Sequence, residues 1–213
     1  MIRLSKQEEL DILYAINPDN FFGEGSSRKV FKFNDKLVKL AVDEGGRLQN
    51  KNELYVAQNH PELVANIYAY GELILVVEPL DFYTEDDWRP FVDEVCEYGY
   101  CEFEEAWLDI TNAHIHDEDE PITLNKELCE AAFNLLMTAN EVLGYSLDND
   151  QMGWSKVDNC FKLYDAGFFC DEDIKVASSG RNYMNCTQIG CIQDYTESEA
   201  IDHAIKTLKK EDK

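Results

Sequence analysis

The sequence has few basic side chains and no long hydrophobic run. Lysine and arginine together number 19 against 43 aspartates and glutamates in 213 residues, so the formal net charge is −24. Because binding to nucleic-acid phosphates requires clustered cations, this balance argues against direct nucleic-acid binding. The apolar run at residues 73–77 is far shorter than the roughly 20 residues that span a bilayer. The first residues lack the apolar stretch of an export signal, so we expect a soluble cytoplasmic protein with no membrane partner.

Cysteines at paired metal-ligand spacing are also absent. The seven cysteines are an odd number, and no two of them are separated by two residues, so we expect reduced thiols. His114 and His116 lie in an acidic stretch and could ligate a metal ion. The two histidines are at alternate positions and no third ligand converges on them, so a solvated acidic loop is the favoured interpretation.

Acidic charge is concentrated in residues 81–120. This segment, called the acidic segment below, holds fifteen acidic residues against Arg89 alone, a net of −14, and eight aromatic residues interleave with them. One interpretation is a pair of amphipathic helices with the aromatics in the core and the acids in water. The other is a docking face for a basic protein, with aromatic anchors inside an acidic rim, or even an imitation of DNA.

The first 80 residues predict a hairpin, a helix and a second hairpin. Ser5 and Glu8 have the spacing of a capping box, which indicates a short helix at the start. Strands are expected at 29–33 and 36–42, with Asn34-Asp35 as the turn, then a helix at 47–59 and strands at 67–70 and 73–77. Later, apolar residues at 128, 131, 135, 139 and 142 predict a helix that Gly144 ends, and a turn at 156–159 separates two short strands.

Four local signals have chemical significance. Gly23 and Gly25 form a Gly-x-Gly turn before a strand, where backbone N–H groups could approach phosphates, although an ordinary hairpin turn has the same pattern. Lys39 lies among apolar residues on a strand and needs a counter-charge or a phosphate, unless the strand is an edge. Glu53, on the following helix, could pair with Lys39 or simply face water. Asp165 ends a strand before Ala166-Gly167, where it could hold a divalent metal or form a plain turn.

Taken in order, these residues resemble the protein-kinase-like fold. The order is a Gly-rich turn, a strand lysine, a helix glutamate, a hinge at residues 78–80 and a late Asp-x-Gly. The stretches 25–31, 38–41 and 46–53 are similar to the small kinase-like proteins encoded by tailed bacteriophages. The resemblance covers roughly residues 20–80 and 125–170.

The resemblance implies a site for ATP and magnesium. Gly23, Gly25 and Val30 would cover the nucleotide, Lys39 would neutralise the α- and β-phosphates, and Glu53 would orient Lys39. Adenine would bind the hinge at Glu78 and Leu80, and Asp165 with Gln151 would hold the metal.

Departures from the family pattern favour a pseudokinase. Arg28 replaces the third glycine of the loop, where it could reach a phosphate or fill the pocket. The segment 146–153 fits the spacing of the catalytic loop, which puts Ser146 in place of the aspartate base and Gln151 in place of the metal-binding asparagine. Serine is not a base at neutral pH, and losing the base commonly costs two to four orders of magnitude in rate. Asp148 or Asp150 could substitute in a remodelled loop.

We therefore expect an α+β, bilobal, protein-kinase-like chain. Residues 1–80 would form a small antiparallel sheet with one crossing helix, and residues 81–213 a reduced helical lobe. The chain would be a nucleotide-binding or vestigial pseudokinase that binds or acts on a host protein, and an active form would phosphorylate Ser or Thr. The alternative is a non-enzymatic acidic inhibitor or DNA mimic that occupies a basic host protein through residues 81–120.

Overall fold

The computed structural model describes residues 1–25, 27–81, 126–143, 152–166 and 195–210. The chain divides into two compact units. The first unit contains residues 1–79 together with residues from Asp165 onward, and the second contains residues 80–164. We expected residues 81–213 to form one lobe, whereas the structure assigns Asp165, Ala166 and the C-terminal helix to the first unit.

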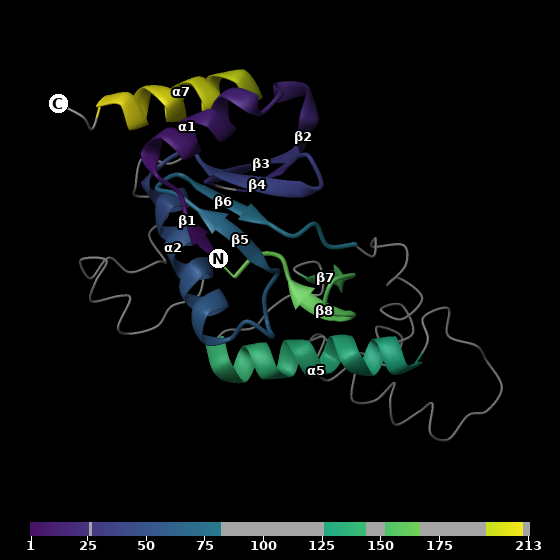
Figure 1. The fold of residues 1–213 in the computed structure, drawn as a ribbon. Coiled ribbons are helices and arrows are strands. Elements are labelled where there is room, and N and C mark those ends of the chain that lie inside the picture. Colours follow the sequence, from purple (N-terminus) through teal and green to yellow (C-terminus); the bar gives the residue numbers. More distant parts are fainter. Residues whose placement is uncertain (26, 82–125, 144–151, 167–194, 211–213) are drawn as a thin grey trace. The chain divides into compact units, whose positions relative to one another are not determined.

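A six-stranded sheet is the centre of the first unit (Figure 1). Its strands lie in the order β1-β5-β6-β4-β3-β2, with bounds β1 Ile2–Arg3, β2 Phe21–Glu24, β3 Arg28–Phe33, β4 Lys36–Ala41, β5 Ile67–Tyr70 and β6 Ile74–Val77. The predicted α+β class and both predicted hairpins are confirmed. The sheet is not wholly antiparallel, because β1 pairs with β5 in parallel.

The β3–β4 hairpin forms for the local reason that the sequence suggests. Asn34 adopts a φ of 56°, the left-handed conformation that asparagine tolerates better than most residues. The register then pairs Val30 with Lys39 and Phe31 with Val38. Because side chains alternate between the two faces of a strand, Val30 and Lys39 share one face, and Phe31 and Val38 share the other.

Helices α1 (Lys6–Ala15) and α7 (Glu197–Lys210) lie side by side against the sheet, as Figure 1 shows. Together with the Phe31 and Val38 face of the sheet they form one core, which includes Leu13, Ile74 and Leu208. The predicted Ser5–Glu8 capping box is present. The sequence analysis missed α7, although Ala200, Ile201, Ala204 and Leu208 have helical spacing.

A buried carboxylate fastens α1 to the β5–β6 turn. Glu9 is only 2% exposed, and it accepts hydrogen bonds from the backbone N–H groups of Glu72 at 2.8 Å, Leu73 at 2.6 Å and Ile74 at 3.1 Å. A Cβ on Gly71 would lie 2.3 Å from the Glu9 carboxyl carbon, so only glycine fits beside this carboxylate.

Helix α2 (Glu44–Asn59) starts three residues before the predicted boundary because Asp43 is its N-cap. The Asp43 side chain accepts a hydrogen bond from the Gly46 N–H at 2.8 Å. The helix contacts β4 and β5. It is the predicted crossing helix.

The second unit contains, among its described residues, helix α5 (Lys126–Leu143) and the hairpin of β7 (Met152–Ser155) and β8 (Cys160–Leu163). The predicted turn at 156–159 is confirmed, with Asn159 at a φ of 53°. The predicted core stripe of α5 is wrong at Ala131, which is exposed, whereas Ala132, Leu135, Ala139 and Leu143 are buried. This stripe advances by 3, 4 and 4 residues and so follows the helical period.

No helix in the described ranges is long and apolar enough to cross a membrane.

Candidate functional site

A buried ion pair joins the predicted lysine and glutamate. Lys39 projects from β4 and its Nζ donates to the Glu53 Oε1 on α2. Lys39 is 5% exposed and Glu53 is 1% exposed, so both charges have lost almost all contact with water. The predicted pairing of a strand lysine with a helix glutamate is therefore present.

Close packing of α2 against the sheet allows this pair to form. A Cβ on Gly46 would lie 2.1 Å from the Ser27 carbonyl oxygen and 3.0 Å from the Ala41 Cα, so the first turn of α2 packs directly on backbone. Asn50 and Glu53 follow Gly46 by four and seven residues and therefore share its face of the helix. Asn50 donates from its Nδ2 to the Leu73 carbonyl oxygen at 3.0 Å, which fixes the same face to the residue that precedes β6.

Arg28, at the start of β3, links Glu53 to Asp165. Its Nη1 donates to the Glu53 Oε2 at 2.7 Å and to the Asn50 Oδ1 at 3.3 Å, and its Nη2 donates to the Asp165 Oδ1 at 2.6 Å. Arg28 is 4% exposed and the Asp165 side chain 27%. The sequence left open whether Arg28 reaches a phosphate or fills the pocket, and in the structure it binds two carboxylates of the site.

We call Arg28, Lys39, Glu53 and Asp165 the charge cluster. Its two cations and two carboxylates sum to zero formal charge. Burial alone would lower the pKa of Arg28, but the charges of Glu53 and Asp165 outweigh it and raise that pKa. Burial lowers the pKa of Lys39, and the attraction of Glu53 offsets this only in part while Arg28 adds to the lowering. The cluster therefore holds Arg28 firmly charged and makes Lys39 less basic than usual.

The glycine-rich turn lies on the strand next to Arg28. Gly23 pairs with Val30 across β2 and β3, and Val30 pairs with Lys39 across β3 and β4, so the three residues are aligned on one face of the sheet. The Gly25 N–H donates to the Arg28 carbonyl oxygen at 2.9 Å and closes the turn. A Cβ at Gly23 or Gly25 would meet no atom within 4 Å, and neither residue has a φ in the range that L side chains rarely adopt.

The hinge residues differ in their surroundings. Glu78 is buried, its N–H donates to the Asn66 carbonyl oxygen at 2.9 Å, and its Oε2 accepts from the Asn66 Nδ2 at 2.8 Å. The backbone N–H of Glu78 is thus already used by Asn66, the residue that precedes β5. Leu80 belongs to the second unit. Some predicted residues lie outside the described part of the chain. These are the catalytic-loop residues Ser146, Asp148, Asp150 and Gln151, together with His114, His116 and all of the acidic segment after Asp81.

The predicted magnesium ligand Asp165 does not fit a divalent cation in this structure. A guanidinium lies at hydrogen-bond distance from its Oδ1, and a second cation beside it would be repelled. Magnesium also prefers several oxygen ligands in octahedral geometry. In the part of the chain that the structure describes, no group of three or more His, Cys, Asp or Glu side chains is arranged to hold a metal ion.

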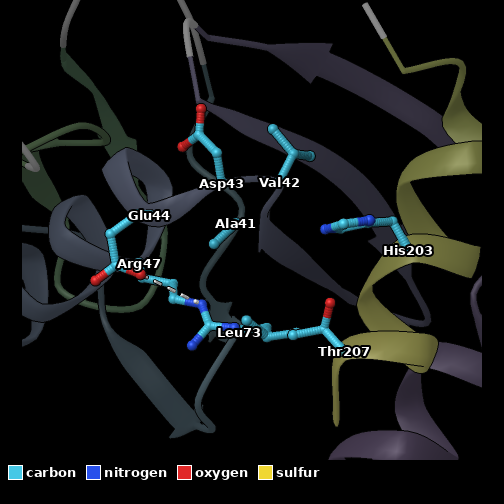
Figure 2. Close-up of a pocket in the computed structure, with 8 residues that line it drawn as sticks. All are labelled: Ala41, Val42, Asp43, Glu44, Arg47, Leu73, His203 and Thr207. Carbon is cyan, nitrogen blue, oxygen red and sulfur yellow. Dashed lines mark ion pairs between the residues drawn. The ribbon is translucent and has the colours of Figure 1, made fainter. Parts of the chain in front are cut away.

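A separate cavity of about 200 Å³ lies between the start of α2 and α7 (Figure 2). Figure 2 shows Glu44 and Arg47 on one side of it and His203 and Thr207 of α7 on the other, and Asp43 also lines it. Arg47 already donates to the Glu72 Oε1 at 2.7 Å. No member of the charge cluster lines this cavity, so it is distinct from the predicted nucleotide site.

Comparison with known proteins gives little further information. No protein-family model matches the chain, and no curated protein matches it significantly. Among solved structures, the chain is similar to the gentamicin complex of APH(2″)-IIa, an aminoglycoside phosphotransferase with a kinase-like fold, at 13% identity and a TM-score of 0.39. The match covers 99% of this chain and 86% of that one. Similarity at this level does not establish a shared family or function.

Proposed function

We propose that this chain is a kinase-like protein that binds a nucleoside triphosphate on the Lys39 face of the sheet and acts as a pseudokinase. The observation that carries the proposal is the Lys39–Glu53 ion pair between a central strand and a crossing helix. An ion pair of this type positions a lysine for the phosphates in kinase-like proteins. A buried ion pair that only stabilised the fold could be replaced at little cost by two well-packed apolar residues.

The two glycines of the β2–β3 turn support the same proposal. Glycine is usually required where φ is positive or where another atom lies too close for a Cβ. Neither reason applies to Gly23 or Gly25, since both have room for a side chain and ordinary backbone conformations. A ligand that approaches this turn would account for them, because backbone N–H groups without neighbouring side chains bind phosphates well.

Binding is favoured over vigorous phosphoryl transfer. The sequence puts Ser146 where the resemblance expects the base, and serine does not accept a proton at neutral pH. Arg28 occupies the third glycine position of the loop and binds Asp165. ATP as the ligand, a phage origin and a host protein as the target belong to this proposal through the sequence resemblance.

A nucleotide titration tests the proposal. Calorimetric titration of the full chain with ATP should give saturable binding at millimolar or lower concentration, and Lys39→Met should weaken it at least about tenfold, because a charged hydrogen bond is worth about 1.5–3 kcal/mol. Lys36→Met is the matched control, since Lys36 lies on the same strand and pairs with the exposed Asp35. Absence of ATP binding by the folded wild-type chain would refute the proposal.

The acidic segment supports a second candidate function. Its net charge of −14 suits a basic partner, which it would engage as an acidic inhibitor or a DNA mimic. Reversing several acids of residues 81–120 to lysine should then abolish binding to that partner, whereas Lys39→Met should leave it intact. The opposite pattern would favour the nucleotide site.

A further inference from the structure

Arg28 gives the candidate site a property that a magnesium-dependent nucleotide site lacks. In the structure its guanidinium lies between two carboxylates from distant parts of the chain, Glu53 at 2.7 Å and Asp165 at 2.6 Å. Arginine is always protonated and its planar donors bind carboxylates strongly, so both contacts persist at any ordinary pH.

The charge balance of the cluster makes a metal ion unnecessary. A carboxylate beside a nucleotide repels the phosphates unless a cation neutralises it, and a divalent metal commonly supplies that cation. Here Arg28 neutralises Asp165, and Lys39 is neutralised by Glu53. A divalent cation at Asp165 would have to displace the guanidinium or accept its repulsion at close range.

Burial makes this displacement costly. Arg28 is 4% exposed and donates to Asn50 as well as to the two carboxylates, so moving it away would break these hydrogen bonds. A buried arginine separated from its carboxylates would keep its charge in a poorly solvated environment. The metal therefore competes with a cation that the fold itself holds in place.

We propose that the Arg28 guanidinium takes the place of a divalent cation at Asp165, so that this site binds nucleotide phosphates without a metal ion. This inference rests on the proposed nucleotide-binding function and specifies its metal requirement. Arg28 acts through Asp165, which makes it a positioning residue.

The first experiment compares ATP binding with magnesium and with EDTA. Wild-type affinity should agree within about twofold in the two conditions, whereas a site in which the metal bridges carboxylate and phosphate should lose at least about tenfold in EDTA. Binding only with magnesium would overturn the inference and leave the proposed function standing. Absence of ATP binding in both conditions would refute the proposed function together with the metal-free binding inferred here.

The second experiment measures Mn²⁺ alone, by electron paramagnetic resonance of the free ion, and does not depend on nucleotide binding. The wild type should bind no Mn²⁺ at Asp165, Arg28→Gln should gain a site, and Arg28→Gln/Asp165→Asn should lose it. Arg47→Gln is the control, because Arg47 pairs with Glu72 outside the charge cluster. Mn²⁺ binding by the wild type that Asp165→Asn abolishes would overturn the role of Arg28, and so would a folded Arg28→Gln variant that gains no site.

Arg28→Lys provides the same test if Arg28→Gln does not fold. A single ammonium keeps the positive charge but does not bridge Glu53 and Asp165 as the two nitrogens of a guanidinium do. This variant should fold and should bind Mn²⁺ more tightly than the wild type. Equal Mn²⁺ affinity in the two proteins would contradict the inference.

Discussion

Removal of the negative charge of Glu53 should destabilise the first unit severely. Glu53 is 1% exposed and accepts hydrogen bonds from both Arg28 and Lys39, which are about 5% exposed. In Glu53→Gln the shape of the side chain remains, but two buried cations face a neutral amide. Loss of one partner of a buried ion pair costs about 3–5 kcal/mol, which is a large fraction of the 5–15 kcal/mol that stabilises a typical protein.

Hydrogen exchange of the β4 amides is a suitable assay, because it reports on the first unit by itself. Amides of Val38 and Leu40, which are fully buried, should lose about 3–5 kcal/mol of protection in Glu53→Gln. Glu62→Gln is the matched control, since Glu62 is 64% exposed and should change protection by less than about 0.5 kcal/mol.

A double variant separates charge from packing. Lys39→Met added to Glu53→Gln removes one of the two buried cations that Glu53 neutralises in the wild type. The double variant should therefore be more stable than the sum of the two single changes predicts, by at least about 1 kcal/mol. If Glu53→Gln alone lowers the protection of the β4 amides by less than about 1 kcal/mol, the reasoning is refuted, because water would then reach these charges in solution.

Three further predictions concern the first unit. Gly71→Ala should lower the free energy of unfolding measured with urea by about 1–3 kcal/mol, because the new Cβ would press on the Glu9 carboxylate that three N–H groups hold. An unchanged urea midpoint would contradict this packing. Ser5→Ala should lower the melting temperature slightly above pH 4.5 and have less effect in more acidic solution. Hydrogen bonds from the Ser5 side chain and backbone lower the pKa of Glu8, and a carboxylate with a lowered pKa contributes stability that disappears as the pH falls through that pKa. Burial lowers the pKa of Lys39 below its ordinary 10.5, so the folded chain binds fewer protons there than the unfolded chain and stability should rise with pH between the two values. Urea unfolding from about pH 8 to about pH 10 should show this rise in the wild type and a smaller one in Lys39→Met.

The elements that depend on neighbouring residues could be predicted from the sequence. The Asn34 turn, the Ser5–Glu8 capping box and the two hairpins follow from local backbone preferences, and the structure contains all of them. The pairing of Lys39 with Glu53 could also be predicted, because the two residues are only fourteen positions apart, on a strand and on the helix that packs back on it.

The tertiary structure decided which long-range partners meet. Arg28 and Asp165 are 137 residues apart. Neither local sequence indicates whether the guanidinium binds a carboxylate of the chain or the phosphate of a ligand. The position of α7 on α1 is likewise a consequence of packing, since an amphipathic helix specifies an apolar face but not the surface that covers it. Local steric and hydrogen-bond preferences act within a few residues. Which opposite charge lies beside a buried charge depends instead on the fold of the whole chain.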